Sequence, residues 1–209
     1  MPPPSRGFFI TLEGIDGAGK STHVPWLVDC IAKRGVEVVA TREPGGTPFG
    51  EVLREILLTR DLSHETQALL MFAGRREHVE RVIGPALARG QWVLCDRFTD
   101  ATYAYQGGGH GVAKDFIREL ARRVHPNCNP DLTLLFDVPS DVSRQRLKRA
   151  ENAGRELDKF EREAEDFFDR VRDAYLELAR AEPQRFRVVD STASVADVRA
   201  RLADIIASL

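Results

Sequence analysis

The clearest chemical signal in the sequence is a glycine-rich segment near its start, Gly14-Ile15-Asp16-Gly17-Ala18-Gly19-Lys20-Ser21. It fits the pattern G-x-x-x-x-G-K-[ST], in which glycines let backbone N–H groups turn inward around phosphate oxygens. A helix that starts at Lys20 would point its positive dipole end at the same anion. The lysine can reach the β- and γ-phosphates, and the hydroxyl of Ser21 can bind Mg²⁺. The segment therefore predicts a site for a nucleoside triphosphate and its magnesium ion.

A second chemical pair, Asp96 and Arg97, follows an apolar run at residues 93–95. A carboxylate at the carboxyl end of a parallel strand faces the crevice in which ligands bind, where it can hold Mg²⁺ through water. The neighbouring guanidinium is a planar fork that fits a phosphate with two hydrogen bonds. A surface ion pair at the end of a strand is the alternative, and the presence of a phosphate loop in the same chain disfavours it.

Three further segments carry groups suited to an acceptor molecule. Residues 41–47 (TREPGGT) place two glycines after a proline, at the end of a predicted strand where backbone can approach a ligand. Phe72 and Arg76 are four residues apart on a predicted helix, so they share a face and could stack on a base and bind its edge. Core packing is the alternative for Phe72. Residues 102–109 supply Thr102, two phenols, an amide and a flexible glycine turn, for which a glycine-capped helix end is the alternative.

The interval from residue 144 to residue 162 is dense in charge. It holds seven basic and four acidic residues, with Gly154 in the middle, whereas the whole chain has a formal net charge of -2. A solvated helix face is the ordinary explanation for such a run.

The elements that must position these groups alternate regularly between strand and helix. Apolar, β-favouring runs occur at residues 8–12, 36–40, 91–95, 132–137 and 186–189, and helical patterns separate them. The first helix is predicted from residue 20 to residue 34, and Ser194 with Asp197 predicts the N-cap of the last. This order predicts an α/β fold of three layers, α/β/α, with a five-stranded parallel sheet flanked by helices.

Composition narrows the class of protein. The 209 residues suit a single domain spanning 1–209, with 43% hydrophobic and 30% charged residues, as is typical of a globular protein. The charge balance argues against a duplex-DNA binder, and no apolar stretch is long enough to span a membrane. The N-terminus shows no signal peptide pattern. Three scattered cysteines predict neither a disulfide framework nor a zinc site, so we expect a cytoplasmic protein.

Taken together, the segments resemble the thymidylate kinase family of nucleoside monophosphate kinases. The matching stretches run through the chain in family order, and those at 96–109 and 42–47 are the specific ones. The full set is LEGIDGAGKST (12–22), TREPGGT (41–47), LMFA (70–73), DRFTDATYAYQGGG (96–109), PDLT (130–133) and LDKFE (157–161). The resemblance implies transfer of the γ-phosphoryl group of ATP to dTMP, giving dTDP, with Mg²⁺ as cofactor. It also implies a homodimer that uses small-molecule substrates and binds no nucleic acid or membrane.

The resemblance assigns roles to individual residues. Phe72 would stack on thymine, Arg76 and Thr102 would bind its edge with Gln106 close by, and Tyr105 would crowd the 2′ position of the sugar. Arg54 and Arg97 would hold the monophosphate, and Asp16 and Glu43 would lie near the acceptor sugar, phosphate and magnesium. ATP would be bound by the loop and the residue after it, with Arg149: these residues are Gly14, Asp16, Gly17, Ala18, Gly19, Lys20, Ser21 and Thr22.

The transferring phosphoryl group needs positive charge around it. The resemblance implies that the charged interval at residues 144–162 is a small mobile lid over ATP. Lys20, Arg97 and an arginine of this lid would supply the charge, with Asp16 as a further catalytic residue and Ser21 and Asp96 as metal ligands. Family members without an arginine after the acidic loop residue, a position occupied here by Gly17, take that arginine from the lid. Arg155 is the first candidate and Arg149 the second. A kinase for another monophosphate or for a deoxynucleoside, and a non-catalytic nucleotide switch, are the alternative functions.

Overall fold

The computed structural model describes residues 6–209, and its centre is one sheet of five parallel strands. The strands are β1 (Phe9–Glu13), β2 (Val38–Arg42), β3 (Trp92–Asp96), β4 (Leu132–Asp137) and β5 (Phe186–Asp190), in the spatial order β2-β3-β1-β4-β5. The predicted strands lie within about two residues of these bounds. Residues 1–5, on which the signal-peptide expectation partly rests, lie outside the described part of the chain.

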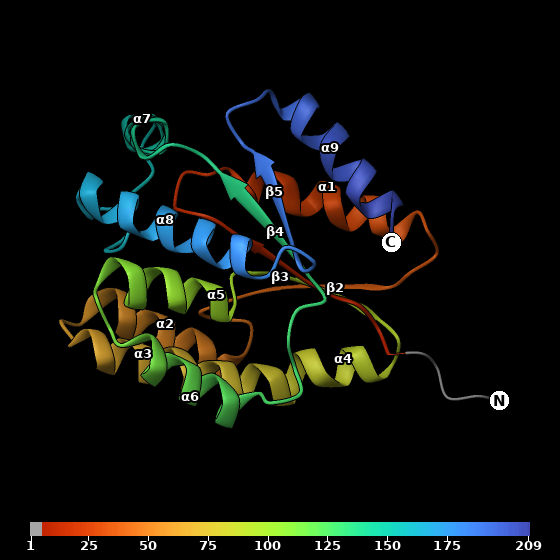
Figure 1. Ribbon diagram of the computed structural model, residues 1–209, viewed down its shortest axis with the longest axis horizontal. Coiled ribbons are helices and arrows are strands. Elements are labelled where there is room, and N and C mark those ends of the chain that lie inside the picture. The colour runs from red at the N-terminus through yellow and green to blue at the C-terminus, as the bar shows by residue number, and fades with distance from the viewer. Residues whose placement is uncertain (1–5) are drawn as a thin grey trace.

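Helices cover both faces of the sheet (Figure 1). The two helices on one face, α1 and α9, pack against each other, whereas α8, α4 and the helices around them cover the other face. Their bounds are α1 (Lys20–Ala32), α2 (Pro48–Thr59), α3 (His64–His78), α4 (Gly84–Ala88), α5 (Thr99–Thr102), α6 (Lys114–Val124), α7 (Ser140–Asn152), α8 (Glu165–Ala181) and α9 (Val195–Ala207), with π-helices η1 (Val79–Ile83) and η2 (Tyr103–Gly109). The predicted three-layer α/β fold is confirmed.

The central strand β1 is buried on both faces of the sheet. Its apolar residues Phe9, Ile10 and Leu12 are fully buried, as expected for a central parallel strand. Its polar residues are buried too: the hydroxyl of Thr11 lies 2.9 Å from that of Thr133 on β4, and Glu13 ends the strand. The buried carboxylate of Glu13 therefore needs partners inside the protein.

The parallel sheet brings the carboxyl ends of its strands to one edge. The strand order reverses at β1, since β1 lies between β3 on one side and β4 on the other. Ligands bind at such a switch point in open α/β sheets. The phosphate loop follows β1 there, and the segments after β2 and β3 lie beside it because these strands run in the same direction.

The glycine run predicted as a flexible turn has a different structure. Residues 107–109 belong to η2, which continues α5 and packs along α8. A β-carbon at Gly109 would overlap the ring of Phe167 on α8, so the absence of a side chain permits this close packing. The run thus builds a rigid wall, and π-helical turns of this kind often occur at functional sites.

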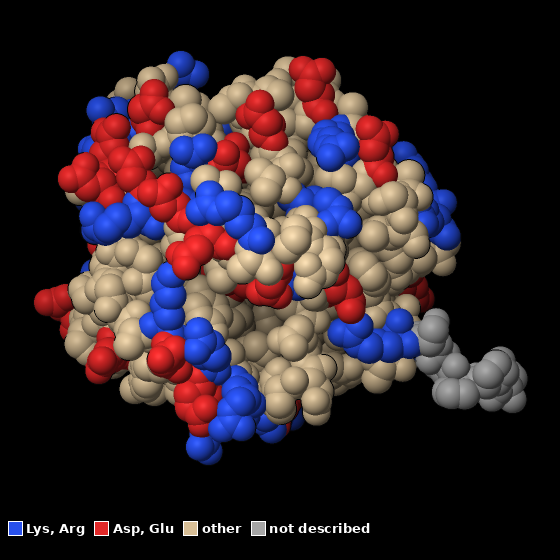
Figure 2. Space-filling view, viewed as in Figure 1, with Lys and Arg blue, Asp and Glu red and all other residues tan. Residues whose placement is uncertain are grey.

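The surface and the cysteines agree with the composition. On the face drawn in Figure 2, basic and acidic residues are interspersed. Cys30, Cys95 and Cys128 are free thiols, as predicted. Between residues 6 and 209, no helix combines the length and the apolar character needed to cross a membrane.

Candidate active site

One large cavity of about 1470 Å³ opens at the carboxyl edge of the sheet. Its walls come from the phosphate loop, α1, the segment after β2, α2, α3, η2, α7 and the loop at residues 153–164. It brings together most of the predicted site residues: Asp16, Gly17, Gly19, Lys20, Ser21, Thr22, Glu43, Arg54, Asp96, Arg97, Thr102, Tyr105, Gln106 and Arg155. Segments far apart in the sequence thus meet around one space.

The phosphate loop has the conformation that its glycines allow. Gly14 has a φ of 135°, and a β-carbon there would overlap the carbonyl oxygen of Phe136 on β4. Nζ of Lys20 donates to the carbonyl oxygens of Gly14 at 2.9 Å and Ile15 at 3.1 Å. Burial, together with the charge of Arg97, lowers the pKa of Lys20. The ammonium is therefore held inside the loop, at the base of the cavity.

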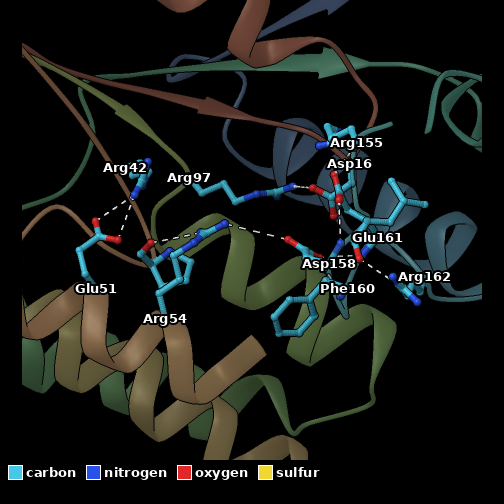
Figure 3. A network of polar contacts seen from close by, with 12 residues as sticks. Asp16, Arg42, Glu51, Arg54, Arg97, Arg155, Asp158, Phe160, Glu161 and Arg162 are labelled. Carbon is cyan, nitrogen blue, oxygen red and sulfur yellow. Dashed lines mark hydrogen bonds and ion pairs between the residues drawn. The ribbon is translucent and has the colours of Figure 1, made fainter. Parts of the chain in front are cut away.

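Arg97 lines the cavity and is the centre of a polar cluster, and Figure 3 shows its side chain pointing toward Asp16. Its Nη2 donates to Oδ1 of Asp16 at 2.6 Å and to the hydroxyl of Tyr105 at 2.8 Å, and its Nη1 donates to the hydroxyl of Tyr175 at 3.1 Å. Burial favours the neutral guanidine, but Asp16 and its neighbours hold the pKa of Arg97 well above its ordinary value. Burial would raise the pKa of Asp16, whereas Arg97 and Lys20 keep it lowered. The cluster holds a fixed cation that faces the cavity.

A second buried cluster joins the segment after β2 to α3. Nε of Arg75 donates to Oε2 of Glu43 at 2.7 Å, while Oε1 of Glu43 lies 2.9 Å from Nδ1 of His78. Nη2 of Arg75 donates to the carbonyl oxygen of Phe98 at 3.0 Å and to the hydroxyl of Thr102 at 3.2 Å. Its Nη1 is buried and has no hydrogen-bond partner. A buried donor without a partner, on a residue that lines the cavity, is available to an acceptor on a ligand.

Two of the predicted base-contacting residues are not placed at the cavity. Phe72 is buried in a small apolar cluster with Val112 and Ile117 and does not line the cavity. Its position is therefore the core packing predicted from the sequence as the alternative. Arg76 is exposed and donates to the carbonyl oxygen of Val124 and to Glu80. The residues of α3 that line the cavity are Met71 and Arg75, one position earlier in each case.

The lid interval begins within α7 and continues into an irregular loop at residues 153–164. Arg155 and Glu161 both line the cavity and pair with each other at 2.8 Å, and both are labelled in Figure 3. Arg149 lies exposed on α7 and does not line the cavity. Arg146, one turn earlier, does line it and donates to the carbonyl oxygens of Gly17 at 3.3 Å and Ser191 at 2.6 Å.

The loop also reaches across the cavity to α2. Arg54 lies 4.0 Å from Asp158, and Nζ of Lys159 donates to the carbonyl oxygen of Arg60 at 3.0 Å. Arg54 donates as well to the carbonyl oxygen of Pro44, in the segment after β2. The charged interval therefore covers one side of the cavity.

The pair Ser21 and Asp96 fits a divalent cation. Both residues line the cavity beside Lys20. Oδ1 of Asp96 is buried and has no hydrogen-bond partner. A hydroxyl and a carboxylate oxygen without a partner are hard oxygen donors of the kind that Mg²⁺ prefers.

Comparison with known proteins gives the same family throughout. A family model described as thymidylate kinase matches residues 12–202. A thymidylate kinase of Bordetella pertussis is 57% identical over 197 residues, which cover 94% of this chain and 93% of that protein. One of Cupriavidus metallidurans is 57% identical over 204 residues, covering 98% of this chain and all of that protein.

A solved structure agrees with these relatives. The crystal structure of thymidylate kinase from Ehrlichia chaffeensis superposes with a TM-score of 0.78 at 33% sequence identity, covering 96% of this chain and 98% of that one. The family, the enzyme class and the fold predicted from the sequence are therefore confirmed. The chain belongs to the thymidylate kinase family of ATP-dependent phosphotransferases.

Proposed function

We propose that the cavity transfers the γ-phosphoryl group of ATP to dTMP and releases ADP and dTDP. The observation that carries this proposal is one continuous cavity, lined at one end by the phosphate loop and at the other by Arg75, Thr102 and Gln106. The first end suits the phosphates of a nucleoside triphosphate, and the second offers hydrogen-bonding groups to a base. Family membership supports the same pair of substrates.

At the ATP end, the backbone of residues 14–19 surrounds the phosphates, and Lys20 and Thr22 follow at the start of α1. Arg146 takes the place of Arg149 in this proposal, because Arg146 lines the cavity beside the loop. Its guanidinium is held by two backbone carbonyl oxygens and so presents a fixed planar surface.

At the acceptor end, Arg97 and Arg54 bind the monophosphate of dTMP. The free Nη1 of Arg75, in place of Arg76, donates to the edge of thymine, with Thr102 and Gln106 beside it. Met71, in place of Phe72, supplies the polarizable surface against which the base lies.

The sugar lies between these groups. Tyr105 is buried, and its hydroxyl is fixed by Arg97 and by Asp16 at 2.7 Å, so its ring forms a rigid wall near the sugar. Asp16 faces the acceptor directly. Glu43 affects the acceptor indirectly, because it holds the guanidinium of Arg75.

The chemistry needs positioning more than proton removal. The attacking oxygen belongs to a phosphate that is already ionised, so no strong general base is required. Catalysis rests on holding donor and acceptor in line and on neutralising the charge that spreads over the transferring group. Lys20 and Arg97 supply fixed positive charge, and Arg155 supplies a third cation from the lid, which covers one side of the cavity.

Magnesium would be held by Ser21 and Asp96, which both line the cavity, and Asp96 has a carboxylate oxygen without a hydrogen-bond partner. Bound there, it would neutralise charge on the phosphate oxygens of ATP.

We also propose a homodimer that works in the cytoplasm. Phe49 and Val52 of α2 and Leu69 of α3 are among the large apolar side chains exposed on the described chain, and α2 packs on α3. One apolar patch formed by these two packed helices would be typical of a protein–protein interface. Sedimentation equilibrium would test the dimer, and a concentration-independent monomer mass would contradict it.

The function is tested by a coupled assay of ADP release with Mg-ATP and a panel of acceptors: dTMP, dUMP, dCMP, dGMP, dAMP, UMP and thymidine. We expect strong turnover with dTMP and much weaker turnover with the purines and thymidine. Turnover with another monophosphate would retain the mechanism and overturn the base assignment. Binding of ATP without turnover on any acceptor would overturn the kinase function.

A further inference from the structure

Arg97 has a backbone conformation that is unusual for a residue with a side chain. Its φ is 68°, and it is the one non-glycine residue in the described range 6–209 with a positive φ. The left-handed region is unfavourable for most residues, so the surrounding contacts must stabilise it. This conformation directs the guanidinium toward Asp16 and the cavity, because the chain turns sharply after β3.

The carboxylate of Glu13 contacts both ends of this arrangement. Oε1 accepts a hydrogen bond of 2.7 Å from the backbone N–H of Phe98, the residue that directly follows Arg97. Oε2 accepts one of 2.7 Å from the hydroxyl of Tyr175 on α8, and that hydroxyl in turn accepts from Nη1 of Arg97 at 3.1 Å. Glu13 therefore holds the backbone of the turn directly and the guanidinium through one hydroxyl.

Glu13 does not line the cavity, so it does not touch the substrates itself. It is fully buried, and burial, with Asp100 adding to it, raises its pKa to about 7, while Arg97 and the bonds from Tyr175 and Phe98 lower it. Lys20 and Cys95 also lie within its electrostatic reach. Burying a carboxyl group costs free energy of desolvation, which its two hydrogen bonds offset. The same two hydrogen bonds stabilise the turn at Arg97.

We propose that Glu13 is a positioning residue for catalysis, which fixes Arg97 in its left-handed turn through Phe98 N–H and Tyr175. This inference rests on the proposed role of Arg97 in binding the acceptor phosphate. Two acceptor oxygens on one side chain are required, because both neighbours are donors. Glutamine keeps one acceptor and turns the other into a donor, so it retains the shape of Glu13 and breaks one of the two bonds.

The test is a double-mutant cycle between Glu13→Gln and Arg97→Lys, with kcat and KM measured for dTMP and for ATP. We expect Glu13→Gln alone to lower kcat/KM for dTMP by roughly tenfold, with the KM for ATP within about twofold, since one buried hydrogen bond to a charged group is lost. In the Arg97→Lys background the same substitution should cost less than about threefold, because the group through which it acts is already changed.

Two further variants keep the test decisive. Tyr175→Phe removes only the hydroxyl between Glu13 and Arg97, so it should lower kcat/KM for dTMP without adding to the effect of Glu13→Gln. Thr11→Val, on the same strand, removes a buried hydrogen bond to Thr133 and touches neither residue. It should lower the melting temperature and leave kcat unchanged.

The outcomes separate the two proposals. Additive losses for Glu13→Gln and Arg97→Lys, or a loss of activity in Thr11→Val equal to that in Glu13→Gln, would show a merely structural role and overturn the inference. An Arg97→Lys enzyme with normal kinetics would overturn the assigned role of Arg97 and, with it, the inference. Wild-type protein that is inactive with every acceptor would instead overturn the proposed function.

Discussion

Replacing Arg75 by lysine should show which of the two neighbouring arginines of α3, Arg75 or Arg76, binds the base. The Arg75 side chain is 1% exposed and uses Nε for Glu43 and Nη2 for Phe98 and Thr102. Its Nη1 has no partner and is the donor that we propose for thymine. A lysine keeps the charge that Glu43 needs but has one nitrogen in place of three. The hydrogen bond to the base is lost, and a hydrogen bond from a charged donor contributes about 1.5–3 kcal/mol.

That free energy corresponds to a fall in kcat/KM for dTMP of roughly 10- to 150-fold. Arg76→Lys is the matched control, because its side chain is 52% exposed and pairs with Glu80 on the surface. It should change kcat/KM by less than about twofold, as surface ion pairs contribute little. The coupled assay of ADP release measures both variants, and their melting temperatures exclude a loss of folded protein. Normal kinetics for Arg75→Lys together with a large loss for Arg76→Lys would refute the assignment.

The remaining predictions concern the lid, the apolar wall and pH. Arg155→Ala should lower kcat by roughly 10³-fold with little change in the KM for dTMP. Arg149→Ala, which changes an exposed arginine, is the control. A kcat of Arg155→Ala within a few-fold of wild type would exclude Arg155 as the lid arginine. Phe72→Ala should reduce the free energy of unfolding by about 3–5 kcal/mol in urea titrations. Met71→Ala should chiefly raise the KM for dTMP. The reverse pattern would show that Phe72, and not Met71, contacts the base. Because the folded-state pKa of Glu13 is raised to about 7 from 4.5, wild type should lose unfolding free energy relative to Glu13→Gln as pH rises from about 4.5 to about 7, with no further change above. A difference independent of pH across that window would contradict the raised pKa.

The sequence predicted those parts of the molecule in which local pattern decides structure. The five strands are short apolar runs, the phosphate loop has a fixed spacing, and the hydroxyl of Ser194 accepts from the N–H of Asp197 as a cap does. Asp96 and Arg97 were placed correctly at the edge of the sheet because they end such a run. In each case the physical cause lies within a few neighbouring residues.

The face of α3 could not be chosen from spacing alone. Phe72 with Arg76 and Met71 with Arg75 are both four residues apart, so the helical period fits both pairs equally. Only the packing of α3 against α2 and α6 decides which pair faces the cavity. The signal that could have found Arg75 is the presence of two consecutive arginines, of which a helix can direct only one inward.

Two other groups were missed for similar reasons. Arg146 and Arg149 are three residues apart on α7, and the direction of that helix past the phosphate loop selects the first. Glu13 looks like the polar end of an apolar strand, and its importance depends on Phe98 and Tyr175, which are distant in sequence. Partners that come from other elements cannot be read from a single segment.

The packing of Gly109 against Phe167 has a consequence for how substitutions alter this enzyme. The wall that carries Tyr105 and Gln106 is one helix thick, and its rear side rests on α8. A methyl group added at Gly109 would push that wall forward without changing any residue that lines the cavity. The packing of η2 on α8 therefore helps to set the width of the cavity beside Tyr105, where we propose that the sugar lies. Substitutions at positions that do not line the cavity can thus change which nucleotides fit it.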